Sequence, residues 1–108
     1  MKTIYIAGKV TGLPIEEVKV KFGAAQSLLR SKGFKAINPL EVVNDLEATW
    51  EDAMKKCIAA LVAVDAVYLL PCYTNSPGAK LELKIAEELC IPVCTDVDGL
   101  VQIISLLD

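Results

Sequence analysis

Ala66-Val67-Tyr68-Leu69-Leu70-Pro71 is a continuous apolar run that stops at a proline. A short apolar run bounded by a turn residue is typical of a strand buried in a sheet. Three other short β-prone runs are Thr3–Ala7, Lys35–Ile37 and Pro92–Thr95. The sequence therefore predicts four short strands, of which the run at residues 66–70 is the most clearly buried.

Segments with helical periodicity alternate with these strands. Pro14, Thr49 and Ser76 mark the starts of three of them, because proline, threonine and serine are favoured at helix amino termini. The fourth is the apolar segment Gly99–Leu107. Strands that alternate with helices form right-handed βαβ units. The sequence therefore predicts one α/β domain over residues 1–108. We expect three layers in the manner of flavodoxin- and Rossmann-like folds, with a mostly parallel sheet of four to five strands and helices on both faces.

The second of these helices carries an apolar stripe. The stripe consists of Trp50, Ala53, Met54, Cys57, Ile58 and Leu61. Residues at these spacings share one face of a helix. We expect these side chains to face the core.

The composition favours a cytoplasmic protein that associates with itself. The chain has 108 residues, of which 54% are hydrophobic and 23% charged, and its net charge is −3. Because so small a domain has little interior, we expect some apolar surface to lie between the subunits of a homo-oligomer, a dimer or higher. Arg30 is the only arginine and there is no basic stripe, so nucleic-acid binding is not predicted. The sequence also shows neither a membrane-spanning run nor a signal peptide, which predicts no membrane association and a location in the cytosol.

Histidine is absent from the sequence, and this restricts the available chemistry. Ser-His and Cys-His nucleophile pairs and histidine-ligated metal sites are excluded, so acid–base work falls to carboxylates, lysines, tyrosines or thiols. The four cysteines, Cys57, Cys72, Cys90 and Cys94, form no C-x-x-C pair. We expect free, mostly buried thiols, no metal and no cofactor.

Ligands of parallel α/β folds bind beyond the carboxyl ends of the strands, where the strand order reverses. Four segments should lie at these ends: Gly8–Gly12, Asn38–Leu40, Cys72–Gly78 and Asp96–Gly99. A binding site for a small molecule is therefore expected among them.

Glu82 is the residue near these segments that most needs an explanation. On a helical wheel it falls near the middle of an apolar arc, flanked by Leu81, Ile85 and Ala86. A glutamate there points towards the sheet, where an unpaired charge is costly. Burial would raise its pKa, while the nearby helix amino terminus would favour its ionised form. Two interpretations stay open: a partly desolvated nucleophile or base, or a structural glutamate paired with a lysine, a tyrosine hydroxyl or backbone amides.

The turn before Glu82 offers groups that could bind a ligand. The Ser76 hydroxyl and the amides of Gly78 and Ala79 should point outward from the helix start, where they could hold an anion or a hydroxyl as well as cap the helix. Tyr73, in the preceding loop, could stack on a base or a sugar, or be an ordinary half-exposed aromatic.

Four segments of the chain carry a family resemblance. They are Ile4-Tyr5-Ile6-Ala7-Gly8 with Gly12, then Asn38-Pro39, then Val64-Asp65-Ala66-Val67-Tyr68-Leu69-Leu70-Pro71, and finally Asn75-Ser76-Pro77-Gly78-Ala79-Lys80-Leu81-Glu82 with Ala86. On these segments, nearly the whole chain resembles the nucleoside 2-deoxyribosyltransferase-like superfamily. Within that superfamily it looks most like the compact branch of domains of unknown function.

This resemblance implies roles for individual residues. Glu82 matches the nucleophilic glutamate of the family, which follows a small-residue turn at this spacing. Ser76 stands where the transferases usually carry an aspartate and where the related 2′-deoxynucleoside 5′-phosphate N-hydrolases carry a phosphate-contacting serine. The remaining candidate ligand-binding positions are Tyr5 and Gly8, which match positions that line the sugar pocket, and Gly12 and Asn38 of the shared segments.

The activity that the resemblance implies is cleavage or transfer of the N-glycosidic bond of a 2′-deoxynucleoside or its 5′-monophosphate through a glutamate nucleophile. The chain departs from the family at Cys57, where these enzymes usually carry a second aspartate near the sugar. That departure favours an alternative function, a non-catalytic nucleotide- or nucleoside-binding module on the same fold. A third interpretation is a structural oligomer in which Glu82 is merely paired.

Overall fold

The computed structural model describes residues 1–45 and 47–107 as an α/β fold. Its elements are β1 (Thr3–Ala7), α1 (Ile15–Ser31), β2 (Lys35–Ile37), α2 (Pro39–Val43), α3 (Trp50–Leu61), β3 (Ala66–Leu69), the 3-10 helix η1 (Pro71–Asn75), α4 (Pro77–Glu88), β4 (Val93–Cys94) and α5 (Val97–Leu107). The sheet order is β2-β1-β3-β4, and each neighbouring pair is parallel. The fold class predicted from the sequence is therefore confirmed. Within the described residues, no helix combines the length and apolar character needed to cross a lipid bilayer.

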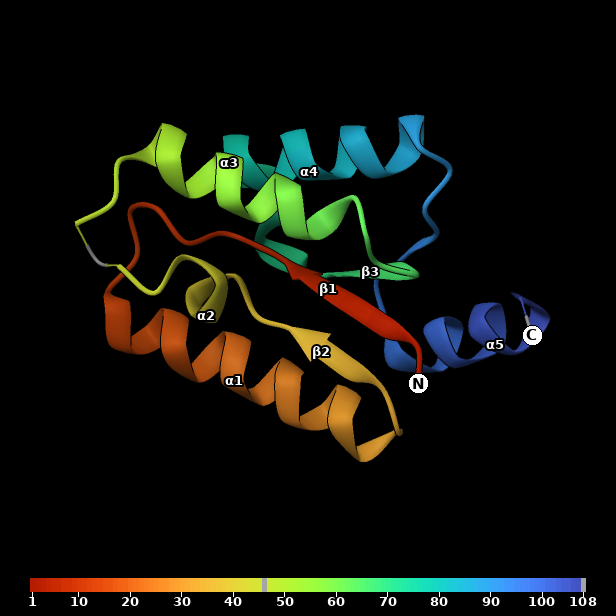
Figure 1. Cartoon of the computed structure of the whole chain (residues 1–108). Helices are drawn as coiled ribbons and strands as arrows, with labels where there is room; N and C mark the ends of the chain where they lie inside the picture. The colour runs from red at the N-terminus through yellow and green to blue at the C-terminus, as the bar shows by residue number, and fades with distance from the viewer. Residues whose placement is uncertain (46, 108) are drawn as a thin grey trace.

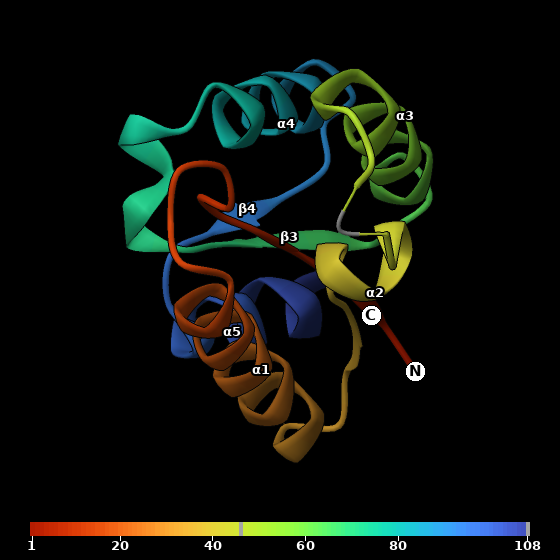
Figure 2. The same ribbon diagram turned by 90° about the vertical axis from the view of Figure 1, so that its left-hand side faces the viewer.

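Helices cover both faces of this sheet and so complete three layers (Figure 1). α3 and α4 lie on one face and α1 and α5 on the other, as the view from the carboxyl ends of the strands shows (Figure 2). The short helix α2 packs against α3 and β1. Because β2 lies on one side of β1 and β3 on the other, the strand order reverses at β1. The expected ligand crevice is therefore at the carboxyl ends of β1 and β3.

The alternation of side chains along β1 divides the core into two parts. Ile4 and Ile6 are fully buried on the face that α1 and α5 cover, around Phe22 of α1. Tyr5 and Ala7 are fully buried on the opposite face, under α3 and α4. The first part is an apolar core, whereas the second contains a phenol hydroxyl that needs a hydrogen-bond partner.

The sequence does not predict two short helices, α2 and η1. The α2 helix begins after Asn38, whose side-chain oxygen accepts a hydrogen bond from the Leu40 N–H at 3.0 Å. The η1 helix begins at Pro71, directly after β3. Each has only five residues, which is too few for an apolar stripe to repeat and indicate a helix.

Two element boundaries also differ from those predicted. β4 covers only the middle two residues of the predicted strand Pro92–Thr95. α5 begins at Val97, two residues before the predicted start at Gly99. The reason is Asp96, whose Oδ1 accepts a hydrogen bond from the Gly99 N–H at 2.6 Å and so supports an earlier first turn.

The loop that follows β1 is fastened to the segment that follows β3. The sulfur of Cys72 accepts hydrogen bonds from the Lys9 N–H at 3.2 Å and from Lys21 Nζ at 3.1 Å, and Lys21 Nζ also donates to the Lys9 carbonyl at 2.8 Å. Burial alone would raise the pKa of the Cys72 thiol, but these donors lower it overall. The two loops at the reversal of strand order are therefore held together.

Gly8, in this first loop, is expected to be required for close packing on Leu70. A Cβ at position 8 would lie 2.9 Å from Leu70 Cδ1 and 3.1 Å from Leu70 Cβ, and Leu70 is itself buried. Gly8→Ala should therefore lower the free energy of unfolding by roughly 1–3 kcal/mol in a denaturant titration. Gly23→Ala is the matched control. Its Cβ would meet no described atom within 4 Å, so this change inside α1 should raise stability by up to about 1 kcal/mol. Equal effects of the two changes would contradict the steric argument.

Candidate active site

Tyr5 and Glu82 form a buried pair between the sheet and α4. The alternation along β1 turns Tyr5 towards α4, and the wheel position of Glu82 turns that side chain towards the sheet. The Tyr5 hydroxyl donates a hydrogen bond to Oε2 of Glu82. Tyr5 is fully buried and Glu82 is only 5% exposed. The sequence placed Glu82 towards the sheet and named a tyrosine hydroxyl as one possible partner, but it did not single out Tyr5.

Burial sets the protonation of this pair and of the thiol beside it. Burial raises the pKa of Glu82 from 4.5 to about 7, although the hydrogen bond from Tyr5 opposes the shift. Burial also raises the pKa of Tyr5, and the negative charge of Glu82 raises it further, so the phenol stays neutral and remains a donor. The pKa of the Cys57 thiol, close to the Tyr5 hydroxyl, is raised mainly by burial. Glu82 is therefore the one of these three groups that changes its charge near neutral pH.

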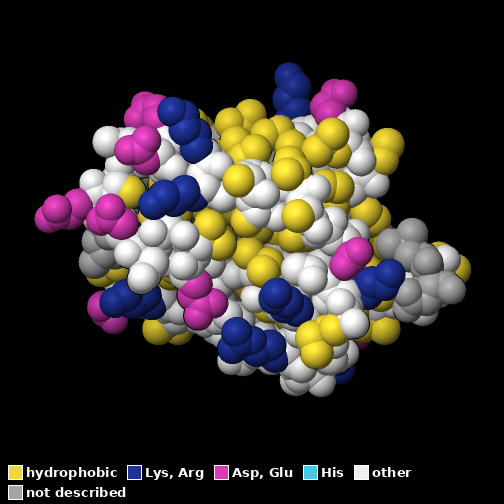
Figure 3. Space-filling view, in the orientation of Figure 1, with side chains coloured by type: hydrophobic (Ala, Val, Ile, Leu, Met, Phe, Trp, Pro, Cys, Tyr) yellow, Lys and Arg dark blue, Asp and Glu magenta, His cyan; other side chains and the backbone are white. Residues whose placement is uncertain are grey.

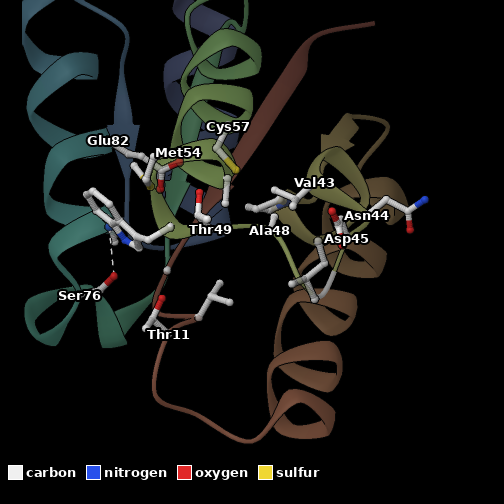
Figure 4. Close-up of a pocket in the computed structure, with 18 of the residues that line it drawn as sticks. Thr11, Val43, Asn44, Asp45, Ala48, Thr49, Met54, Cys57, Ser76 and Glu82 are labelled. Atoms are coloured by element: carbon white, nitrogen blue, oxygen red, sulfur yellow. Dashed lines mark hydrogen bonds between the residues drawn. The ribbon is translucent and has the colours of Figure 1, made fainter.

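A cavity of about 560 Å³ opens beside this pair, at the expected ends of β1 and β3. Its lining includes Cys57 and Met54 of α3 together with Glu82 of α4, and Thr11 and Ser76 from the two loops (Figure 4). Three of the four segments predicted at this edge contribute to the described lining, and residues 96–99 do not. The volume is within the usual range for small-molecule sites, so the cavity can hold a ligand of nucleoside size.

One oxygen of Glu82 faces this cavity. Oε2 accepts the hydrogen bond from Tyr5, and the side chain lines the open space. In the described part of the chain, no fully buried side-chain oxygen lacks a hydrogen-bond partner. Oε1, for which the described residues supply no partner, therefore keeps contact with the cavity.

The structure brings together six of the site residues predicted from the sequence. They are Tyr5, Gly8, Ser76, Gly78, Ala79 and Glu82. Among the residues that the structure describes, Gly12, Asn38 and Tyr73 do not line the cavity. Gly12 is exposed in a turn with φ of 87°, and Asn38 caps α2 and donates to Gln26 Oε1 at 3.3 Å. Tyr73 packs half-buried against the core cluster under α3 and α4.

Ser76 is a helix cap as well as a cavity residue. Its Oγ accepts a hydrogen bond from the Ala79 N–H at 3.1 Å, and the residue is 7% exposed. The Ala79 amide that was expected to point at a ligand is therefore occupied by the cap. The hydroxyl hydrogen of Ser76 is still available for donation to a ligand.

The sequence did not predict the cavity wall that α2, α3 and their connection build. The residues of this wall are Val43, Asn44, Asp45, Ala48, Thr49, Trp50, Ala53 and Met54. Trp50, which was expected to face the core, is 43% exposed and lines the cavity. The signal was present, because Trp50, Met54 and Cys57 share one helix face. However, periodicity does not distinguish a side that faces a core from a side that faces a cavity.

The charged groups around the cavity are few. Lys19 of α1 is the only cation in the described lining, and its Nζ lies 3.5 Å from Glu16 Oε1 in an exposed pair. Residues 1–45 and 47–107 contain no group of three or more cysteine, aspartate or glutamate side chains placed to hold a metal ion.

Comparison with known proteins gives the family of the chain. The family model described as a domain of unknown function, DUF4406, matches residues 2–95, so the chain belongs to this family. The matched span contains all the cavity-lining residues named above. No curated protein matches the sequence.

The burial of Glu82 predicts a pH-dependent stability that Glu82→Gln should remove. The folded protein holds the Glu82 proton more tightly than the unfolded chain, because the pKa is about 7 in the fold and 4.5 ordinarily. The contribution of Glu82 to the free energy of unfolding should therefore be complete below about pH 4.5. It should fall by roughly 3 kcal/mol as the pH rises to about 7. The measurement is the difference in unfolding free energy between wild type and Glu82→Gln across this range. A difference that does not change with pH would contradict a raised pKa.

Proposed function

We propose that this protein cleaves or transfers the N-glycosidic bond of 2′-deoxynucleosides or their 5′-monophosphates, with Glu82 as the nucleophile. The observation that carries the proposal is the Tyr5–Glu82 pair beside a cavity of about 560 Å³. One carboxylate oxygen is held by Tyr5 and the other is open to a ligand. The family resemblance of the segment 75–82 supports the same role for Glu82.

The reaction follows the course of a retaining glycosidase. Glu82 Oε1 attacks the anomeric carbon while the bond from that carbon to the base nitrogen breaks. The electron pair of the broken bond goes to the base, which takes up a proton from water at the cavity mouth. Water, for hydrolysis, or the N–H nitrogen of a second base, for transfer, then attacks the same carbon and releases Glu82 as a carboxylate. The proton that this nucleophile loses neutralises the hydroxide left by the first proton transfer. Tyr5 stays neutral throughout and holds Oε2, which fixes the direction of Oε1.

Ser76 and Lys19 support binding of the 5′ end of the ligand. The Ser76 hydroxyl can donate to a 5′-hydroxyl or a 5′-phosphate near the start of α4. Lys19 lines the same cavity and could offset part of the charge of a phosphate. Tyr73 does not take part in this proposal, because it packs against the core cluster under α3 and α4.

Cys57 favours the alternative function, a non-catalytic nucleotide- or nucleoside-binding module. It is 5% exposed and lines the cavity beside Glu82, where the resembling enzymes usually carry an aspartate. Its raised pKa keeps the thiol neutral, so it supplies no second negative charge near the sugar. A binding module would raise its melting temperature with a deoxynucleoside and release no base.

The proposal also includes self-association and a location in the cytosol. Apolar side chains gather on the surface over the layer of α3 and α4 (Figure 3). Val62, Leu81 and Leu89 of these helices and their ends are between 37% and 54% exposed, which supports a contact with a second copy. All four cysteines are free thiols, which supports a reducing compartment.

Base release is the direct test of the catalytic function. Wild-type protein incubated with deoxynucleosides and their monophosphates should release the base, as liquid chromatography would show. Glu82→Ala and Glu82→Gln should each lower the rate on the order of 10³-fold or more, because the covalent intermediate can no longer form. A 2-fluoro-2-deoxy analogue should add the mass of the sugar to the peptide that contains Glu82. Equal base release by wild type and Glu82→Ala would contradict the proposal.

Tyr5→Phe should shift the pH–rate profile towards higher pH. The Tyr5 hydrogen bond lowers the pKa of Glu82, so its removal should raise that pKa above about 7 and leave less carboxylate at neutral pH. The rate of base release should fall most at acidic and neutral pH and recover partly in alkaline buffer. A uniform loss at every pH would instead indicate that Tyr5 acts only through the shape of the site.

A further inference from the structure

Trp50 is a large aromatic side chain left open on the cavity wall. It is the first residue of α3, directly after Thr49, whose Oγ1 caps the helix by accepting a hydrogen bond from the Asp52 N–H at 3.1 Å. It is 43% exposed and lines the cavity. Other exposed apolar side chains, such as Leu89, lie outside the described lining. The exposed part of the Trp50 side chain therefore contributes to the cavity wall.

The indole is held against α4 at Gly78. A Cβ at this glycine would lie 3.6 Å from Trp50 Nε1 and 3.1 Å from Met54 Sδ. The absence of a side chain at Gly78 thus lets α3 and α4 approach closely, with the indole and the thioether at the contact. An aromatic ring fixed in this way loses little conformational entropy when a ligand stacks on it.

The position of the indole relative to Glu82 fits the geometry of the proposed reaction. Gly78 and Glu82 are four residues apart on one face of α4, so the indole contacts α4 about one helical turn, roughly 5–6 Å, from the backbone of Glu82. A nucleophile attacks the anomeric carbon from the side opposite the leaving base. With Glu82 at the buried end of the cavity, the base must therefore lie towards the open end, where Trp50 is exposed.

We propose that the Trp50 indole is the platform on which the planar heterocyclic base of the ligand stacks, an inference that rests on the function proposed above. The two other aromatic candidates near the site are unsuited to this role. Tyr5 is fully buried and its hydroxyl is bonded to Glu82, and Tyr73 packs against the core cluster under α3 and α4. Stacking on an indole tolerates every base, because each base has a π face. The platform thus selects for a planar base and leaves choice among bases to the polar groups around it.

Tryptophan fluorescence reports on this contact directly, because Trp50 is the only tryptophan in the chain. The Glu82→Gln protein, which should bind without turnover, is titrated with 2′-deoxyadenosine and separately with 2-deoxyribose, which has no base. The deoxynucleoside should quench the emission saturably, and the free sugar should leave it unchanged. Binding of the deoxynucleoside, seen by calorimetry, without any change in emission would overturn the inference.

Substitution of Trp50 gives the second measurement. In calorimetric titrations, Trp50→Ala should weaken binding of 2′-deoxyadenosine by about 5- to 150-fold, the range expected for one stacked base. Trp50→Phe should retain most of the affinity. Val20→Ala, at an exposed apolar side chain of α1 that does not line the cavity, is the control and should leave the affinity unchanged. An affinity of Trp50→Ala within about twofold of the wild-type value would overturn the inference, and the fluorescence result does not depend on whether this variant folds.

The outcomes separate this inference from the catalytic proposal. Quenching together with weaker binding by Trp50→Ala, but no base release by wild type, would keep the platform and overturn the glycosidic chemistry. Base release by wild type with an unchanged KM in Trp50→Ala would keep the chemistry and overturn the platform. Failure to bind any deoxynucleoside or deoxynucleoside 5′-monophosphate would overturn both.

Discussion

A carboxyl group buried under a helix is the constraint on which the arrangement of this protein depends. Burial of the Glu82 carboxyl is costly unless a hydrogen-bond donor replaces the water that it loses. The Tyr5 hydroxyl, on the first strand of the sheet, is that donor. The contact joins residues 77 positions apart in the chain. It therefore links α4 to β1 beside the cavity that Ser76 and Gly78 also line.

The cavity exists because the two helices over Tyr5 present different kinds of residue at that end. α4 offers small residues in its first turn, Gly78 and Ala79, while α3 offers the larger Trp50 and Met54. Large side chains opposite small ones let the helices approach without filling the space above the carboxyl group. The result is a cavity with the Glu82 carboxyl at its buried end and the Trp50 indole on its exposed wall.

The sequence predicted the helices and strands better than it predicted the cavity. Strand limits at Thr3–Ala7 and Lys35–Ile37 are confirmed, because short β-prone runs there are bounded by residues that end strands. The caps at Thr49 and Ser76 are confirmed for the same local reason. By contrast, α2 is too short to be predicted from periodicity. The role of Trp50 depends on the cavity that it faces, which the sequence does not show. The pairing of Tyr5 with Glu82 is likewise a long-range contact that no local pattern encodes.

The sheet also separates two core clusters that depend on different interactions. On the side of α1 and α5, Phe22 and Leu100 are fully buried in a core of mainly apolar side chains. Substitutions there that keep the volume should alter stability while leaving the Tyr5–Glu82 geometry in place, since distant sites behave nearly additively. The stability of the fold can therefore change through substitutions on one side of the sheet while the cavity on the other side keeps its shape.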